Sequence, residues 1–186
     1  MSVGSTAAAA ATQLSDILTR IEERPVDELI NAIYQAKKLF FAGAGRSMLI
    51  LRCIAMRMMH LGFESYVVGD TTTPAFEVND LIIFGSGSGE TSGLINIAKR
   101  VRSLGGKMAV ITTRKSATLG QLSDICIEIP AYPDHVGDSD LQAVIFPGGS
   151  IFEQSMLLLG DSIVLPLAIR QGVPLDRKFD RHANLE

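Results

Sequence analysis

Apolar residues follow two different patterns along this 186-residue chain. Up to about residue 36 they recur at the three- and four-residue spacing of amphipathic helices, and Pro25 can open the second of these helices. Beyond that point they gather in short runs that are apolar throughout. Such runs are typical of strands that are covered on both faces of a parallel sheet. The pattern therefore predicts helices first and a buried parallel sheet afterwards.

Five of these runs are expected to be strands, and helical patterns separate several of them. The expected strands are Leu39–Ala42, Tyr66–Val68, Leu81–Phe84, Met108–Ile111 and Ile125–Ile129. The expected helices after the first strand are Met48–His60, Leu94–Leu104, Ala117–Leu122 and Ile151–Arg170. This alternation predicts an α/β fold with a doubly wound, parallel, five-stranded sheet flanked by helices. We expect a single domain over residues 13–186, with residues 1–12 disordered or frayed because they are small and polar.

Composition narrows the functional class. Hydrophobic residues make up 47% of the chain, and 17 basic against 20 acidic residues leave a net charge of −3, which argues against a nucleic-acid or polybasic membrane binder. No membrane span and no signal peptide is expected, so we predict a cytoplasmic protein. Cys53 and Cys126 lie in apolar stretches and are interpreted as reduced core residues. An enzyme or a ligand-binding module is the natural expectation.

A first glycine-rich loop, Gly43-Ala44-Gly45-Arg46-Ser47, follows the first expected strand. Ligands bind beyond the carboxyl ends of parallel strands, and glycines let backbone N–H groups approach an anion there. The guanidinium of Arg46 suits phosphate. A dinucleotide-binding loop is a weaker alternative, because Met48 replaces its third glycine, although Asp70 is placed tolerably for a ribose. A plain tight turn also fits this loop.

A second loop, Gly85–Thr91, alternates glycines with three hydroxyl residues, Ser86, Ser88 and Thr91. Hydroxyls and exposed backbone N–H groups can together donate to phosphate oxygens. The loop has no Lys for a triphosphate site and lacks the register of a hydrolase nucleophile elbow. Capping of the next helix would need only one hydroxyl. The three hydroxyls therefore favour a monophosphate site.

These residues resemble a known family. The second loop is similar to the phosphate loop of SIS (sugar isomerase) domains, and the first loop to their sugar-contacting loop. Val68–Pro74, Phe152–Gln154 and the tail Arg181–Glu186 resemble one branch, the 6-phospho-3-hexuloisomerases. The resemblance runs over nearly the whole chain. It implies a three-layer α-β-α domain that interconverts D-arabino-3-hexulose 6-phosphate and fructose 6-phosphate, the second step of formaldehyde fixation by the ribulose monophosphate pathway.

The resemblance also implies roles for individual residues. Glu153 would be the general base, and His182 would open the sugar ring or relay a proton. Asn184 and Glu186 are weaker candidates. Without the resemblance, Ser150–Glu153 would be interpreted as a helix-capping box. A His so close to the terminus would be interpreted as a solvated side chain. The implied substrate- and phosphate-binding residues are Gly45, Arg46, Ser47, Thr72, Ser86, Ser88 and Thr91.

Enediol chemistry of this kind needs no metal and no cofactor, and we expect none. His60, His135 and His182 are too far apart in the sequence for a metal-binding motif. Two alternatives stay open: another phosphosugar isomerase of the SIS family, and a non-catalytic sugar-phosphate-binding module. Residues 1–38 are too short and too acidic for a helix-turn-helix, so no nucleic-acid partner is expected. The resemblance implies a homotetramer with sites near subunit interfaces, in which His182 serves its own or a neighbouring subunit.

Overall fold

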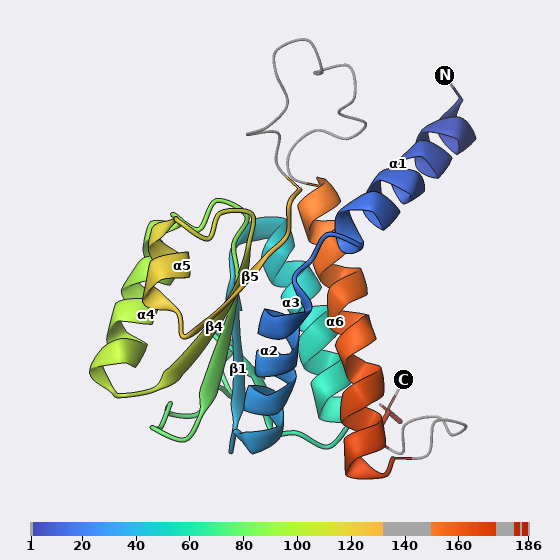
Figure 1. Cartoon of the computed structure of the whole chain (residues 1–186). Coiled ribbons are helices and arrows are strands. Elements are labelled where there is room, and N and C mark those ends of the chain that lie inside the picture. Colours follow the sequence, from blue (N-terminus) through green and yellow to red (C-terminus); the bar gives the residue numbers. More distant parts are fainter. Residues whose placement is uncertain (1, 132–149, 174–180, 183, 186) are drawn as a thin grey trace.

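A fully parallel, five-stranded sheet forms the centre of the molecule (Figure 1). The structure is a computed structural model that describes residues 2–131, 150–173, 181–182 and 184–185. The strand order is β2-β1-β3-β4-β5. The strands are β1 (Leu39–Gly43), β2 (Ser65–Val67), β3 (Leu81–Gly85), β4 (Lys107–Thr112) and β5 (Ile125–Glu128). The predicted doubly wound α/β fold is confirmed, and each predicted strand lies within one residue of the observed one.

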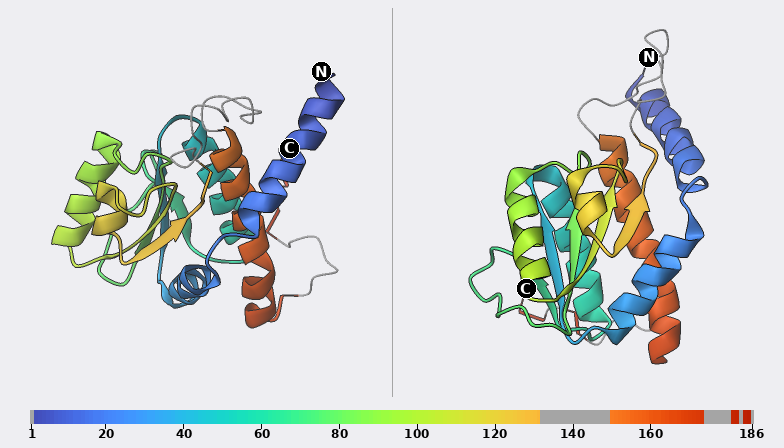
Figure 2. Two further views of the ribbon diagram at one scale, coloured as in Figure 1. Left: turned by 45° about the horizontal axis from the view of Figure 1, so that its top comes forward. Right: turned by 60° about the vertical axis from the view of Figure 1, so that its left-hand side comes forward.

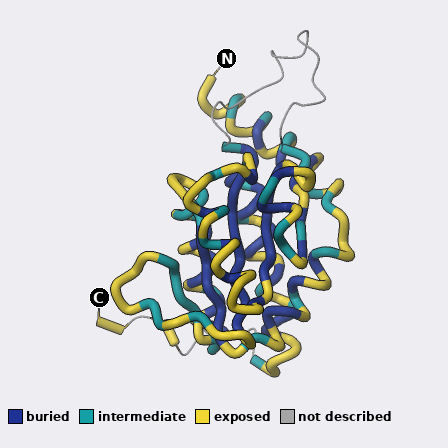
Figure 3. Tube along the Cα trace, turned by 90° about the vertical axis from the view of Figure 1, so that its left-hand side faces the viewer, coloured by how far each residue is buried: buried dark blue, intermediate teal, exposed yellow. Residues whose placement is uncertain are grey.

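Helices cover both faces of this sheet. On one face lie α1 (Val3–Leu18), α2 (Glu23–Gln35), α3 (Gly45–His60) and α6 (Ser150–Gln171), and on the other lie α4 (Ser92–Ser103) and α5 (Thr118–Leu122). Alternate residues of one strand enter the two cores: Phe41 packs towards the first set of helices and Phe40 towards the second. Figure 3 shows the strands as the buried centre of the molecule. The continuous apolar runs in the sequence are therefore explained by burial on both faces.

Helix α1 corrects the expectation for the N-terminus. It begins at Val3, so residues 3–12 are helical where a frayed segment was predicted. The Ser2 hydroxyl accepts a hydrogen bond from the backbone N–H of Ser5, and the alanines that follow are the best helix formers. The first buried residue of α1 is Ala10, and the turns before it project beyond the body of the molecule (Figure 2).

The prediction of two core cysteines was wrong for Cys53. This residue is exposed on α3, whose buried face is formed by Leu51, Ile54, Ala55 and Met58. Met56 is also exposed, so apolar composition alone did not reveal which face of this helix is buried. Cys126 on β5 is half-buried, and burial raises the pKa of its thiol to about 11. Both cysteines are free thiols.

Helix α6 packs against α3 along the first face of the sheet. Gly160 permits the close approach, because a Cβ atom there would lie 2.5 Å from two carbons of Ile54. By length and composition α6 is the one described helix that could cross a membrane. Over half of its apolar stretch, 56%, is buried inside the molecule. This burial is what the core helix of a globular domain shows.

Candidate functional site

The two glycine-rich loops leave the sheet side by side. Gly43 and Gly85 are register partners on the adjacent strands β1 and β3. A Cβ atom on either glycine would lie 3.0 Å from Cδ1 of Leu51, and one on Gly85 would lie 2.9 Å from Sδ of Met156. The glycines thus allow α3 and α6 to pack closely against the ends of these strands. The first turns of both helices are brought to the edge of the sheet where parallel α/β folds bind ligands.

The second loop, residues 85–91, is anchored to its neighbours by hydrogen bonds. The carbonyl of Gly87 accepts bonds from the hydroxyls of Thr112 (3.2 Å) and Thr113 (2.8 Å) and from the backbone N–H of Thr113 (3.1 Å). The carboxylate of Glu90 accepts bonds from the backbone N–H and the hydroxyl of Thr118, at 2.7 and 2.8 Å. These two bonds hold the pKa of Glu90 below its usual value. The loop is therefore fixed by β4 and α5.

The three hydroxyls of this loop are not equivalent. Ser86 is buried, and its Oγ accepts a hydrogen bond from the backbone N–H of Gly89 and lies 3.3 Å from Oγ1 of Thr91. Ser88 is exposed, and its Oγ accepts a bond from the backbone N–H of Glu90. Ser86 therefore shapes the loop, whereas Ser88 and the half-buried Thr91 are better placed to meet a ligand.

Arg46 and Glu153 meet across the first turns of α3 and α6. Nε of Arg46 lies 2.6 Å from Oε2 of Glu153. The Glu153 side chain is only 9% exposed, and its burial raises the pKa of the carboxyl group while the guanidinium of Arg46 lowers it. A buried carboxylate with a raised pKa at this edge of the sheet has the properties of a general base.

Gly45 and Ser47 flank Arg46 in the first loop. Gly45 is exposed and adopts a φ of +55°, a backbone conformation that favours glycine. Ser47 is half-buried in the first turn of α3. Both residues lie next to Arg46 in the chain and therefore close to its ion pair with Glu153; their role in substrate binding stays a prediction.

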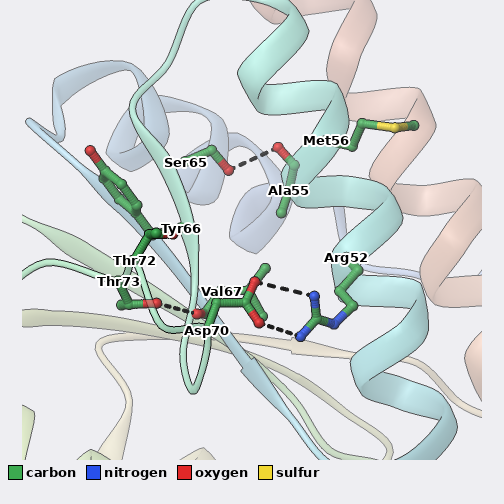
Figure 4. Close-up of a pocket in the computed structure, with 9 residues that line it drawn as sticks. All are labelled: Arg52, Ala55, Met56, Ser65, Tyr66, Val67, Asp70, Thr72 and Thr73. Atoms are coloured by element: carbon green, nitrogen blue, oxygen red, sulfur yellow. Dashed lines mark hydrogen bonds and ion pairs between the residues drawn. The ribbon is translucent and has the colours of Figure 1, made fainter. Parts of the chain in front are cut away.

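Thr72 lines a cavity that is separate from the ion pair and from the second loop. A cavity of about 210 Å³ between α3 and β2 is lined by Thr72, Thr73, Arg52 and Asp70 among others (Figure 4). Arg52 donates two hydrogen bonds to the carboxylate of Asp70, so this acid is already engaged and the dinucleotide alternative loses its ribose ligand. The residues that line this cavity do not include Arg46, Glu153 or the second loop.

His182 lies far from Glu153 within one subunit. Its ring stacks on that of His60 with centroids 5.2 Å apart, and Nη1 of Arg181 lies 3.5 Å from the carbonyl oxygen of Gly62. His60 ends α3, whereas Arg46 is in its first turn, and a helix of 16 residues is roughly 24 Å long. The structure therefore brings Arg46 and Glu153 together but does not bring His182 to them. Among the weaker candidates, Asn184 is exposed, and Glu186 lies outside the described residues.

The sequence analysis missed several residues that support the site. Thr112, Thr113 and Glu90 hold the second loop, and the ion pair of Glu153 with Arg46 was not anticipated. One signal was available for the threonines, since Thr112 ends β4, the strand beside β3, and Thr113 directly follows it. Within the described ranges, no group of three or more His, Cys, Asp or Glu residues could hold a metal ion. His135 lies outside those ranges.

Comparisons with known proteins cover most of the chain. A family model described as the SIS domain matches residues 32–152. The 3-hexulose-6-phosphate isomerase of Bacillus subtilis (strain 168) is 38% identical over 174 residues, which is 94% of each chain. That of Mycobacterium gastri is 37% identical over 176 residues, which is 94% of this chain and 86% of the other. A crystal structure from Methanococcus jannaschii, whose inferred molecular function is 3-hexulose-6-phosphate isomerase, aligns with a TM-score of 0.79 at 32% identity over 97% of each chain.

Proposed function

The chain belongs to the SIS domain family, and we propose that it is an isomerase that interconverts D-arabino-3-hexulose 6-phosphate and fructose 6-phosphate. The family predicted from the sequence is thereby confirmed. The isomerase names of the relatives, at 37–38% identity over 94% of this chain, support the proposed activity. The observation that carries it is the placement of a buried carboxylate, Glu153, over the strand ends from which a preorganised hydroxyl loop emerges.

The second loop binds the phosphate of the sugar. Ser88 and Thr91 donate hydroxyl hydrogen bonds to phosphate oxygens, and the loop backbone at the start of α4 adds N–H donors and the positive end of the helix. Because Thr112, Thr113 and Glu90 already fix the loop, little conformational freedom is lost on binding. The phosphate then positions the reacting carbons relative to Glu153.

Glu153 moves the proton between C2 and C3. Its carboxylate takes the C2 proton of the 3-keto sugar, and the electron pair of the broken C–H bond forms the C2=C3 bond of an enediol while the C3 oxygen takes a proton from water. Glu153 then returns its proton to C3, and the hydroxyl on O2 gives its proton back to water, which leaves the C2 ketone. Burial makes this carboxylate a stronger base than an exposed one. One group serves both transfers because the two carbons are adjacent.

A coupled assay tests the activity directly. The 3-hexulose phosphate is generated in situ from formaldehyde and ribulose 5-phosphate, and formation of fructose 6-phosphate is followed. We expect turnover with the phosphorylated sugar and very little with the unphosphorylated hexulose. Turnover only with an aldose phosphate would replace the proposal by another sugar-phosphate isomerisation. Binding of sugar phosphates without any turnover would favour a non-catalytic module.

The proposed assembly is a cytoplasmic homotetramer whose sites lie near subunit interfaces. The two free thiols fit a reducing compartment. Exposed apolar side chains on the two helices of the site support self-association: Leu49 and Met56 on α3, and Leu165 and Ile169 on α6. His182 is too far from Glu153 to act in its own subunit, so in this assembly it completes the pocket of a neighbour.

Subunit mixing tests the shared site. Glu153→Gln and His182→Ala should each be strongly impaired alone, but a mixed oligomer contains some pockets in which both residues are intact. Refolding the two variants together should therefore recover a fraction of the activity. Confirmed subunit exchange without recovery would rule the shared site out, and a monomer by light scattering would rule out the assembly.

A further inference from the structure

Arg46 and Glu153 are held together by charge alone. Nε of Arg46 lies 2.6 Å from Oε2 of Glu153, yet this buried oxygen makes no hydrogen bond within the described part of the chain. The two partners differ in burial: the Glu153 side chain is 9% exposed and that of Arg46 is 54% exposed. A buried carboxylate is thus neutralised by a cation that can turn towards solvent without crossing the core.

The position of Arg46 does not stabilise its own helix. The N-terminus of a helix is the positive end of its dipole, so a cation in the first turn is unfavourable there. The first turn of α3 has no acidic residue to compensate. At the preceding residue, Gly45, a Cβ atom would have nothing within 4 Å, so the backbone here is not packed against other elements. The positive charge of Arg46 therefore stabilises Glu153 on α6, or a bound ligand, and not α3 itself.

We propose that Arg46 is a substrate-operated latch on the general base: its ion pair shields Glu153 in the free enzyme, and the phosphate of the bound sugar withdraws the guanidinium and releases the carboxylate. This inference rests on the proposed function, because it requires a phosphate in the second loop and Glu153 as the base. Arg46 then contacts the phosphate of the substrate, and it affects the proton transfer only through Glu153.

Phosphate is the stronger partner for a guanidinium. It carries up to two charges against one for the carboxylate, and its oxygens can accept two parallel N–H bonds from the planar fork of Arg46. The exchange also requires little movement. The loops of Arg46 and of the hydroxyls leave the sheet at the register partners Gly43 and Gly85, on neighbouring strands roughly 5 Å apart. The guanidinium stays paired throughout, and the carboxylate becomes free only when a substrate is present.

The release has a measurable consequence for proton affinity. Burial raises the pKa of Glu153, and among the described residues Arg46 is the charged group that acts against this by lowering it. Loss of an opposite charge at this distance raises a carboxyl pKa by about 1–3 units. The latch therefore makes Glu153 a stronger base at the moment when its proton acceptance is needed.

The experiment uses inorganic sulfate as the probe, because sulfate has the shape and charge of a phosphate dianion and no proton to gain or lose near neutral pH. The pKa of Glu153 is measured by NMR of the 13C-labelled carboxyl group, assigned with Glu153→Gln, in the free protein and in saturating sulfate. We expect sulfate to raise this pKa by at least one unit. In Arg46→Met the pKa of Glu153 should already be raised in the free protein, and sulfate should raise it little further.

Arg52→Met is the matched control. Arg52 is also an exposed arginine on α3 in an ion pair with a carboxylate, that of Asp70, and it lies outside the proposed contact. This variant should behave as the wild type. An unchanged pKa of Glu153 while sulfate saturates the amides of the second loop would overturn the latch and leave the proposed isomerase intact. Absence of any sulfate-induced shift in those amides would overturn both the phosphate site and the latch.

Discussion

The two loops at the carboxyl edge of the sheet are built in opposite ways. The second loop, residues 85–91, is tied by side-chain hydrogen bonds to β4 and α5, and its residue Ser86 is buried. The first loop, residues 43–47, is exposed at Gly45 and Arg46 and is linked to α6 by an ion pair that lacks a hydrogen bond. The proposed phosphate site is therefore already fixed by hydrogen bonds in the folded chain. Among the described residues, the proposed base, by contrast, is paired only with an exposed side chain that is free to move.

The largest effect is expected at the base itself. Glu153→Gln keeps the size of the side chain and removes its ability to take a proton, so kcat should fall by about 10²–10⁴-fold, equivalent to about 3–5 kcal/mol. KM should change little, since phosphate binding is untouched. Steady-state kinetics in the coupled assay provide the measurement. The control is Asp161→Asn, an exposed carboxylate on the same helix, which should keep full activity. Wild-type turnover in Glu153→Gln would reduce Glu153 to a structural role.

The next effect contrasts the two loops in stability. Gly89 in the second loop has a φ of +65°, and a Cβ there would lie 2.6 Å from that of Ala117, whereas Gly45 has a φ of +55° and open space around it. Gly89→Ala should cost about 2–4 kcal/mol through backbone strain and overpacking together. Gly45→Ala should cost only about 1–2 kcal/mol, from strain alone. Urea unfolding of both variants checks the difference, and equal losses would show that the loops are equally packed.

A smaller effect is expected from the two ligand-facing hydroxyls. Ser88→Ala and Thr91→Ala each remove a contact that is made in both the ground state and the transition state. Each should raise KM roughly 5–10-fold with a small change in kcat, which corresponds to about 1 kcal/mol. Initial rates over a range of substrate concentrations separate the two constants. A fall in kcat at unchanged KM would place these hydroxyls at the reacting carbons instead.

The smallest effect concerns the far end of α3, away from both loops. Burial, followed by the charges of His182 and Arg57, lowers the pKa of His60 below its ordinary value of 6.5. The unfolded chain therefore binds the proton more readily, and stability is lost as the pH falls from about 6.5 through the lower pKa of the folded state. His60→Gln should flatten this part of the curve of unfolding free energy against pH. An identical slope in the variant would assign the dependence to other groups.

The strands were predictable because burial on both faces leaves little choice of residue. Positions such as Phe40 and Phe41 point to opposite faces, and both faces demand apolar side chains. Exposure on a helix is harder to predict, since one exposed position such as Cys53 can lie within a largely apolar stretch. The residues of α1 before Ala10 were misjudged because small side chains were interpreted as a lack of structure, although alanine favours the helix.

The site was predictable only in part. The hydroxyls and glycines of the second loop form a local motif, so their proximity follows from the sequence itself. The contact between Arg46 and Glu153 joins residues 107 positions apart, and it depends on how α6 packs on α3. Neither periodicity nor spacing carries that information. The same is true of His182, whose place beside His60 follows from the path of the tail.

Hydrogen exchange at a single carbon tests the proposed proton transfer most directly. Fructose 6-phosphate is incubated with the enzyme in D2O, and the position of the incorporated deuterium is read by NMR. Removal and return of the proton by Glu153 should place deuterium at C3 with the wild-type enzyme, and at least 100-fold more slowly with Glu153→Gln. Deuterium at C1 with none at C3 would contradict the proposal, because it would mean an aldose–ketose isomerisation. Equal exchange at C3 in Glu153→Gln would mean that another group carries the proton.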